Sequence, residues 1–136
     1  MNSLKNIKIL IVDDESDVRN LLAEQFAEKG ATVFEAKSGS EAIEILRKQA
    51  IDVVISDIKM NNLDGVELNK LIKKEIDPAP LVYFCSAFVD NSTDAAFLLG
   101  VEEIFGKPVE LNTMVEKITL DLNRLRPKLL GMQDLR

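Results

Sequence analysis

The chain has 136 residues, 46% of them hydrophobic and 29% charged, which is typical of a single globular domain with one core. Its net charge of −6 argues against direct binding to nucleic acid or anionic membrane, and no apolar stretch is long enough to cross a bilayer. The sequence has no histidine and one cysteine, which argues against zinc and favours an oxygen-ligated ion such as Mg²⁺, Mn²⁺ or Ca²⁺.

Five apolar segments of strand length recur along the chain, and most are rich in valine, isoleucine and aromatic residues. Several are apolar at nearly every position, which is typical of strands covered on both faces, as in a parallel sheet. The expected strands are 7–12, 32–35, 52–56, 81–85 and 101–105.

Amphipathic segments alternate with these strands. Their apolar residues recur at helical spacing within 18–26, 42–46, 66–72, 95–99 and 111–125, the fourth pattern being the weakest. Gly30 is expected to end the first helix, Ser38 or Ser40 to cap the second, and Gly100 to stop the fourth. A strand followed by a helix five times predicts a doubly wound α/β fold, with a parallel sheet and helices on both faces.

Reactive side chains follow four of the five predicted strands, where doubly wound sheets bind ligands. Asp13 and Asp14 follow the first strand, Asp57 the third, Ser86 the fourth and Lys107 the fifth. Three aspartates around one point would repel one another without a counter-ion, which a lysine or Mg²⁺ could supply. An aspartate needs no general base to act as a nucleophile, so the set suits phosphoryl transfer onto a carboxylate.

Simpler interpretations of these residues remain open when each is taken alone. Asp14 or Ser16 could cap the helix that follows. Ser86 could bond to the backbone, and Lys107 could be a surface lysine before a proline turn. The coincidence of four strand ends favours the functional interpretation of the set.

Four segments together resemble the receiver domain of two-component response regulators, including chemotaxis receivers. They are ILIVDDE at 9–15, VVISDIKMNNLDG at 53–65, VYFCSA at 82–87 and GVEEIFGKP at 100–108. The resemblance implies a flavodoxin-like (βα)5 fold with strand order 2-1-3-4-5. It also implies a receiver domain over residues 1–126, with residues 127–136 as a C-terminal tail or linker.

The resemblance implies a role for each matching residue. Asp57 would accept the phosphoryl group, and Lys107 and Ser86 would contact it. Mg²⁺, or Mn²⁺ in its place, would be held by the carboxylates of Asp13, Asp14 and Asp57 and by the backbone carbonyl of Lys59.

The function implied is a phosphorelay switch in the cytoplasm, not an enzyme. A histidine kinase or phosphotransfer protein would donate the phosphoryl group, and the surface of helix 4, strand 5 and helix 5 would signal to an output domain or protein, with a homodimer allowed. Two other classes are disfavoured. A docking module that needs no phosphate usually lacks one of these residues, and an aspartyl phosphatase would carry an acid in place of Lys59.

Two positions depart from the family pattern, and the C-terminal helix leaves a choice. Ile104 stands where many relatives carry an aromatic switch residue, and Phe105 should face the other side of its strand. Asn61 replaces a proline common in relatives.

The leucine spacing of 111–129 fits either a short coiled coil or a helix packed on the sheet, and the second is favoured.

Overall fold

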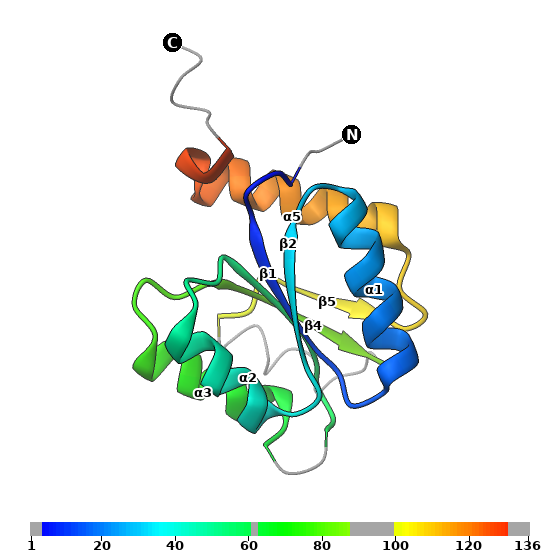
Figure 1. The fold of residues 1–136 in the computed structure, drawn as a ribbon, viewed down its shortest axis with the longest axis vertical. Coiled ribbons are helices and arrows are strands. Elements are labelled where there is room, and N and C mark those ends of the chain that lie inside the picture. The colour runs from blue at the N-terminus through cyan, green and yellow to red at the C-terminus, as the bar shows by residue number, and fades with distance from the viewer. Residues whose placement is uncertain (1–3, 61–62, 88–99, 131–136) are drawn as a thin grey trace.

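The computed structural model describes residues 4–60, 63–87 and 100–130, and it confirms the predicted α/β fold (Figure 1). Five parallel strands form one sheet in the order β2-β1-β3-β4-β5. The strands are β1 (Lys8–Val12), β2 (Thr32–Ala36), β3 (Val53–Asp57), β4 (Leu81–Ser86) and β5 (Glu103–Gly106). The helices are α1 (Ser16–Glu28), α2 (Gly39–Lys48), α3 (Gly65–Glu75) and α5 (Leu111–Leu125). The predicted helix at 95–99 lies outside the described residues.

Helix ends show which of the predicted capping residues act. Ser38 caps α2, since its Oγ accepts a hydrogen bond from the backbone N–H of Glu41 at 3.1 Å, whereas Ser40 lies inside the helix. Gly30 follows the end of α1 with a φ of 97°, a left-handed conformation that glycine adopts at little cost. The prediction that Asp14 or Ser16 caps α1 is wrong, because the N-cap is Glu15 and its side chain makes no capping hydrogen bond.

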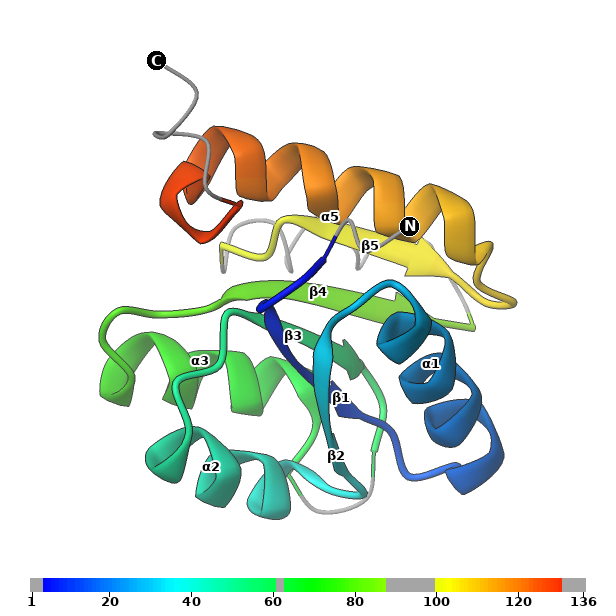
Figure 2. The same cartoon turned by 45° about the horizontal axis from the view of Figure 1, so that its top comes forward.

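The two faces of the sheet carry separate hydrophobic clusters. Figure 2 shows the helices that cover them, on opposite sides of the sheet. Helices α1 and α5 cover one face, where Phe26 and Ile118 are fully buried, and α2 and α3 cover the other, where Ile72 is fully buried. Successive residues of β1 alternate between the clusters, which explains why the strand is apolar throughout. Each such side chain contributes roughly 1.5–3 kcal/mol of transfer free energy.

Helix α5 packs on the sheet, as the favoured interpretation of its leucine spacing requires. Val115, Ile118 and Leu122 are buried in the cluster shared with α1, so they are not available for a coiled coil. A 3₁₀ turn, Pro127–Leu130, follows the helix, and the domain boundary at residue 126 stays a prediction. Within residues 4–60, 63–87 and 100–130, the longest apolar helical stretch falls short of what a membrane span needs.

A buried polar pair joins β4 to α5. The Tyr83 hydroxyl donates a hydrogen bond to Asp121 Oδ2 at 2.7 Å, and Lys117 Nζ lies 3.0 Å from Asp121 Oδ1. Both Tyr83 and Asp121 are buried. Burial and the neighbouring carboxylate raise the pKa of Tyr83, so its hydroxyl stays a donor at neutral pH. The pair satisfies two groups that would be costly to bury alone and fixes α5 against the sheet.

Candidate functional site

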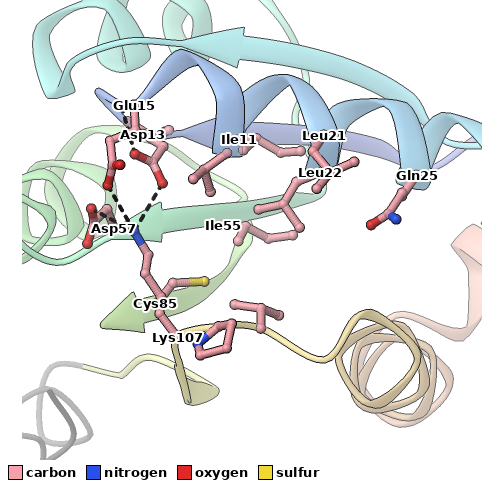
Figure 3. Close-up of a pocket in the computed structure, with 14 residues that line it drawn as sticks. Ile11, Asp13, Glu15, Leu21, Leu22, Gln25, Ile55, Asp57, Cys85 and Lys107 are labelled. Carbon is pink, nitrogen blue, oxygen red and sulfur yellow. Dashed lines mark hydrogen bonds and ion pairs between the residues drawn. The ribbon is translucent and has the colours of Figure 1, made fainter. Parts of the chain in front are cut away.

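Side chains at the carboxyl ends of β1, β3 and β5 meet at one edge of the sheet (Figure 3). Lys107 Nζ lies 3.3 Å from Asp13 Oδ2 and 3.1 Å from Asp57 Oδ2. It also lies 4.0 Å from the carboxylate of Glu15, whose side chain is exposed. The ammonium group therefore neutralises part of the charge of two aspartates that are distant in sequence.

The three predicted aspartates also form one cluster of oxygen ligands. One carboxylate oxygen from each of Asp13, Asp14 and Asp57 can be chosen so that all three lie within 4.8 Å of one another. Asp13 is buried, Asp57 is half-buried and Asp14 is exposed, so the cluster opens to solvent on one side. An oxygen-only donor set with an open side fits Mg²⁺, which keeps several waters and accepts few carboxylates.

The pKa of Asp57 is set by burial and by its charged and hydrogen-bonding neighbours. Burial, with the nearby charge of Asp13, raises the pKa of Asp57 above its ordinary value. The hydrogen bond from Lys107 and one from the backbone N–H of Lys59 lower this pKa without cancelling the rise. For Lys107, burial lowers the pKa, but the two aspartates outweigh it and the net direction is upward. Lys107 is therefore a firmly protonated cation facing a carboxylate that is costly to ionise.

The remaining predicted residues lie close to this cluster. Ser86 ends β4, and its backbone carbonyl accepts a hydrogen bond from the backbone N–H of Lys107 at 2.8 Å. Lys59 has an exposed side chain and lies two residues after Asp57, in the segment that leaves the end of β3. Asn61 lies outside the described residues. The structure thus brings Asp13, Asp14, Asp57 and Lys107 together and places Ser86 at the adjoining strand end.

The two residues at the expected switch position face opposite sides of β5. Ile104 is buried in the cluster with α2 and α3. Phe105 packs on the other face and stacks on Tyr83, with ring centroids 6.1 Å apart. Phe105 therefore cannot replace the aromatic residue that relatives carry three positions before the lysine, as the alternation of strand side chains predicts.

A pocket of about 500 Å³ extends from the charged cluster along α1. Its charged end is formed by Asp13, Asp57 and Lys107, and its apolar walls include Ile11, Leu22 and Val109 (Figure 3). Leu21 lines the same pocket and is 56% exposed. The Asp57 carboxylate thus lies at the charged end of a partly apolar groove.

Gly65 lies against the backbone of Asp57, a contact that the sequence motifs do not predict. A Cβ atom at this position would lie 2.5 Å from the backbone carbonyl oxygen of Asp57 and 3.0 Å from the Cα of Ile58. The Gly65 N–H also donates to the carbonyl of Ile58 at 2.8 Å. The start of α3 is therefore pressed against the backbone that carries Asp57. The only signal in the sequence is a glycine after the helix-capping Asp64.

Replacing Gly65 by alanine is expected to lower the free energy of unfolding by about 1–3 kcal/mol, as overpacking does. Alanine has the higher helix propensity, so a helix-propensity effect alone would have the opposite sign. Urea unfolding of Gly65→Ala measures the change, and Ser16→Ala, at the exposed first residue of α1, is the matched control. Equal stability of Gly65→Ala and the wild type would show that the contact is not restrictive.

Comparisons with known proteins agree with this arrangement. The family model described as response regulator receiver domain matches residues 9–119. The heme response regulator HssR of Staphylococcus aureus is 27% identical over 118 residues, covering 87% of this chain and 52% of that protein. The sensor histidine kinase RcsC of Escherichia coli is 31% identical over 121 residues, covering 89% of this chain and 13% of that protein.

Solved structures give the same result. A response regulator receiver protein from Pseudomonas putida superposes with a TM-score of 0.79 at 26% identity, covering 85% of this chain and 97% of that one. A two-component response regulator from Clostridium difficile has a TM-score of 0.82 at 24% identity, a likeness of fold, and covers 88% of this chain and 98% of that one. The chain spans about half the length of HssR and about an eighth of RcsC.

Proposed function

Since the chain belongs to the family of response regulator receiver domains, a family of signalling domains, we propose that it is a phosphorylation switch. In this proposal Asp57 accepts a phosphoryl group in a Mg²⁺-dependent reaction, and the donor is a phosphohistidine of a histidine kinase or phosphotransfer protein. The domain promotes only its own phosphorylation and dephosphorylation, and it acts in the cytoplasm as a signalling component.

The observation that carries the proposal is the contact of Lys107 Nζ with Asp57 at 3.1 Å and with Asp13 at 3.3 Å inside the aspartate cluster. This arrangement keeps a nucleophilic carboxylate beside a fixed cation, where a phosphoryl group would bring further negative charge. Such a cation costs no reorganisation when charge develops on the phosphoryl oxygens. A surface ion pair would not need two further carboxylates at the same point.

The chemistry requires one bond to form and one to break. An oxygen of Asp57 attacks phosphorus and forms a P–O bond, while the P–N bond of the phosphohistidine breaks and its electron pair stays on the imidazole nitrogen. The attacking group in this proposal is the ionised carboxylate of Asp57, so the chain needs no general base, and the sequence contains no histidine that could act as one. Hydrolysis of the acyl phosphate by water would restore the carboxylate.

The residues that would hold Mg²⁺ are Asp13, Asp14, Asp57 and, through its backbone carbonyl, Lys59. The bound ion would supply charge neutralisation between the carboxylates and the phosphoryl oxygens. Lys107 would exchange its contact with the Asp57 carboxylate for a phosphoryl oxygen, and the Ser86 hydroxyl would donate to another.

The groove along α1 supports access by a protein donor. Its walls are apolar next to the charged cluster, and Leu21 is exposed at the same helix face. A phosphohistidine has to approach Asp57 from the solvent side of the cluster, so the donor domain would lie against α1 and the segment after β5. An exposed leucine beside a functional cleft is a suitable contact for such a partner.

Signalling would proceed through Ser86, the last residue of β4, and Lys107, which directly follows β5. These residues are already joined by a backbone hydrogen bond, so a shift of one displaces the other. In the proposal, phosphorylation changes the surface formed by helix 4, β5 and α5, and an output domain or protein reads the change. Ile104 is buried at the usual aromatic position, so the switch would work without a rotating aromatic ring.

The test is the intact mass of the chain after incubation with Mg²⁺ and a small-molecule phosphodonor such as acetyl phosphate. We expect a gain of one phosphoryl group, which is lost when EDTA is added before the donor. If Mg²⁺ binds but no mass is gained, a phosphorylated histidine protein serves as the second donor. Failure with both donors would contradict the proposal and favour a docking module.

A further inference from the structure

Arg19 of α1 joins two parts of the molecule that lie beside the aspartate cluster. Its Nη1 donates a hydrogen bond to the backbone carbonyl oxygen of Asp13 at 2.8 Å, and its Nε donates to Glu35 Oε1 on β2 at 3.1 Å. The Arg19 side chain is only 16% exposed, whereas that of its partner Glu35 is 38% exposed. A planar guanidinium can satisfy both partners at once in a fixed geometry.

These contacts complete a set that fixes Asp13 from several sides. The Asp13 backbone N–H donates to the carbonyl of Ala36 on β2 at 3.1 Å, and Arg19 binds the Asp13 carbonyl. One carboxylate oxygen of Asp13 accepts the backbone N–H of Glu15 at 2.9 Å. The main chain is therefore held on both sides of Asp13, directly before Asp14, and only the second Asp13 oxygen faces Lys107.

We propose that Arg19 is a positioning residue for the cation site: by clamping the Asp13 carbonyl, it holds Asp13 and Asp14 in the geometry that binds a divalent cation. The inference rests on the proposed function, because it assumes that these carboxylates bind Mg²⁺. Residues outside the ligand set that fix ligand orientation commonly change metal affinity. Glu35 orients the guanidinium in turn and balances its charge.

Electrostatics alone predicts the opposite sign. A positive charge near a cation site weakens cation binding, so its removal would tighten binding. Positioning and electrostatics therefore make contrary predictions for a neutral residue at position 19. The exposed part of the Arg19–Glu35 ion pair is also screened at physiological salt, which reduces the electrostatic contribution further.

The experiment is a calorimetric titration of the full chain with MgCl₂ at about 0.15 M salt. For Arg19→Met we expect the Kd for Mg²⁺ to rise about tenfold, as loss of a ligand-orienting contact does. Arg19→Lys keeps the charge and one donor, so its Kd should lie between those of the wild type and Arg19→Met. Arg47→Met is the control. Arg47 Nη2 lies 3.1 Å from Glu75 Oε1, and this pair is away from the cation site, so the Kd should be unchanged.

The outcomes separate this inference from the function on which it rests. If the wild type binds Mg²⁺ and Arg19→Met binds it equally or more tightly, the positioning role is refuted while the proposed function stands. If the wild type binds no Mg²⁺, both fail. If Arg19 had a purely structural role, Arg19→Met would lower the phosphorylation rate at every Mg²⁺ concentration. If Arg19 positions the ligands, the variant needs more Mg²⁺ for a half-maximal rate, and its rate at saturating Mg²⁺ is unchanged.

A second variant tests the clamp without changing Arg19, so that misfolding of the arginine variants would not explain its result. Glu35→Met removes the oxygen acceptor that orients Arg19 and leaves Arg19 itself in place. We expect it to weaken Mg²⁺ binding less than Arg19→Met does, and to cause no further weakening when combined with Arg19→Met. If the Glu35 substitution weakened Mg²⁺ binding equally in the wild type and in Arg19→Met, Glu35 would act by its charge, and the clamp would be contradicted.

Discussion

Asp57→Asn is expected to abolish the gain of a phosphoryl group from any donor. The amide has no ionised oxygen to attack phosphorus, and no histidine in the chain could serve as an alternative acceptor. Intact mass after incubation with Mg²⁺ and acetyl phosphate should show only the unmodified chain. Complete loss is expected, in contrast to the reduced rates that follow from removing a group that only stabilises charge.

Asp52→Asn is the matched control for this variant. Asp52 directly precedes β3, Asp57 ends the strand, and burial raises the pKa of both carboxyls. Asp52 lies at the amino edge of the sheet, so Asp52→Asn should accept the phosphoryl group at the wild-type rate. Phosphorylation of Asp57→Asn, or its loss in Asp52→Asn, would contradict the assignment of the acceptor.

Misfolding would not explain a negative result, because Asp57→Asn is expected to be more stable than the wild type at pH 7 without Mg²⁺. Burial raises the folded-state pKa of Asp57, so ionised Asp57 opposes folding. The stability of the wild type should therefore fall as pH rises from the unfolded-state pKa through the folded-state pKa. The variant lacks this contribution, and urea unfolding at two pH values measures the difference.

Lys107→Met is expected to lower the phosphorylation rate about 10²–10³-fold at saturating Mg²⁺, the usual cost of losing one preorganised charge-stabilising group. The ammonium group contacts both Asp13 and Asp57, so it lies where negative charge develops. Methionine has a similar length and no charge. Initial rates of mass gain with acetyl phosphate give the comparison.

The same variant should bind Mg²⁺ more tightly than the wild type. Lys107 competes with a cation for the carboxylates of Asp13 and Asp57, and its removal leaves them to the ion alone. A slower reaction with tighter Mg²⁺ binding is a combination that misfolding does not produce. Lys117→Met is the control, since Lys117 pairs with the buried Asp121 on α5 and should alter neither quantity.

The sequence determined the fold because its hydrophobic pattern is local and repeated. Near-continuous apolar strands alternate with amphipathic helices, and only a sheet covered on both faces buries both patterns. The charged residues of the candidate site could be predicted for the same reason, because carboxyl ends of parallel strands share one edge. Asp13, Asp57 and Lys107 were therefore expected together, and they are in contact.

Helix capping shows where local reasoning was insufficient. Asp14 and Ser16 are good capping residues by type, yet neither caps α1. The Asp13 carboxylate accepts the N–H of Glu15 instead, and the Asp13 backbone is bound by β2 and Arg19. The bonds to β2 and to Arg19 join Asp13 to other elements of the fold, and their formation depends on tertiary placement that no capping preference contains.

What the sequence by itself determined is the order of elements, the sheet they form and the set of charged groups at its carboxyl edge. Only the tertiary structure decided what fixes those groups: the Arg19 clamp on Asp13, the contact of Gly65 with the Asp57 backbone and the Tyr83–Asp121 bond under α5. The physical reason is the distance along the chain over which each feature is determined. Apolar periodicity is read from neighbours along the chain, whereas a single hydrogen bond or close contact depends on atoms placed by the whole fold.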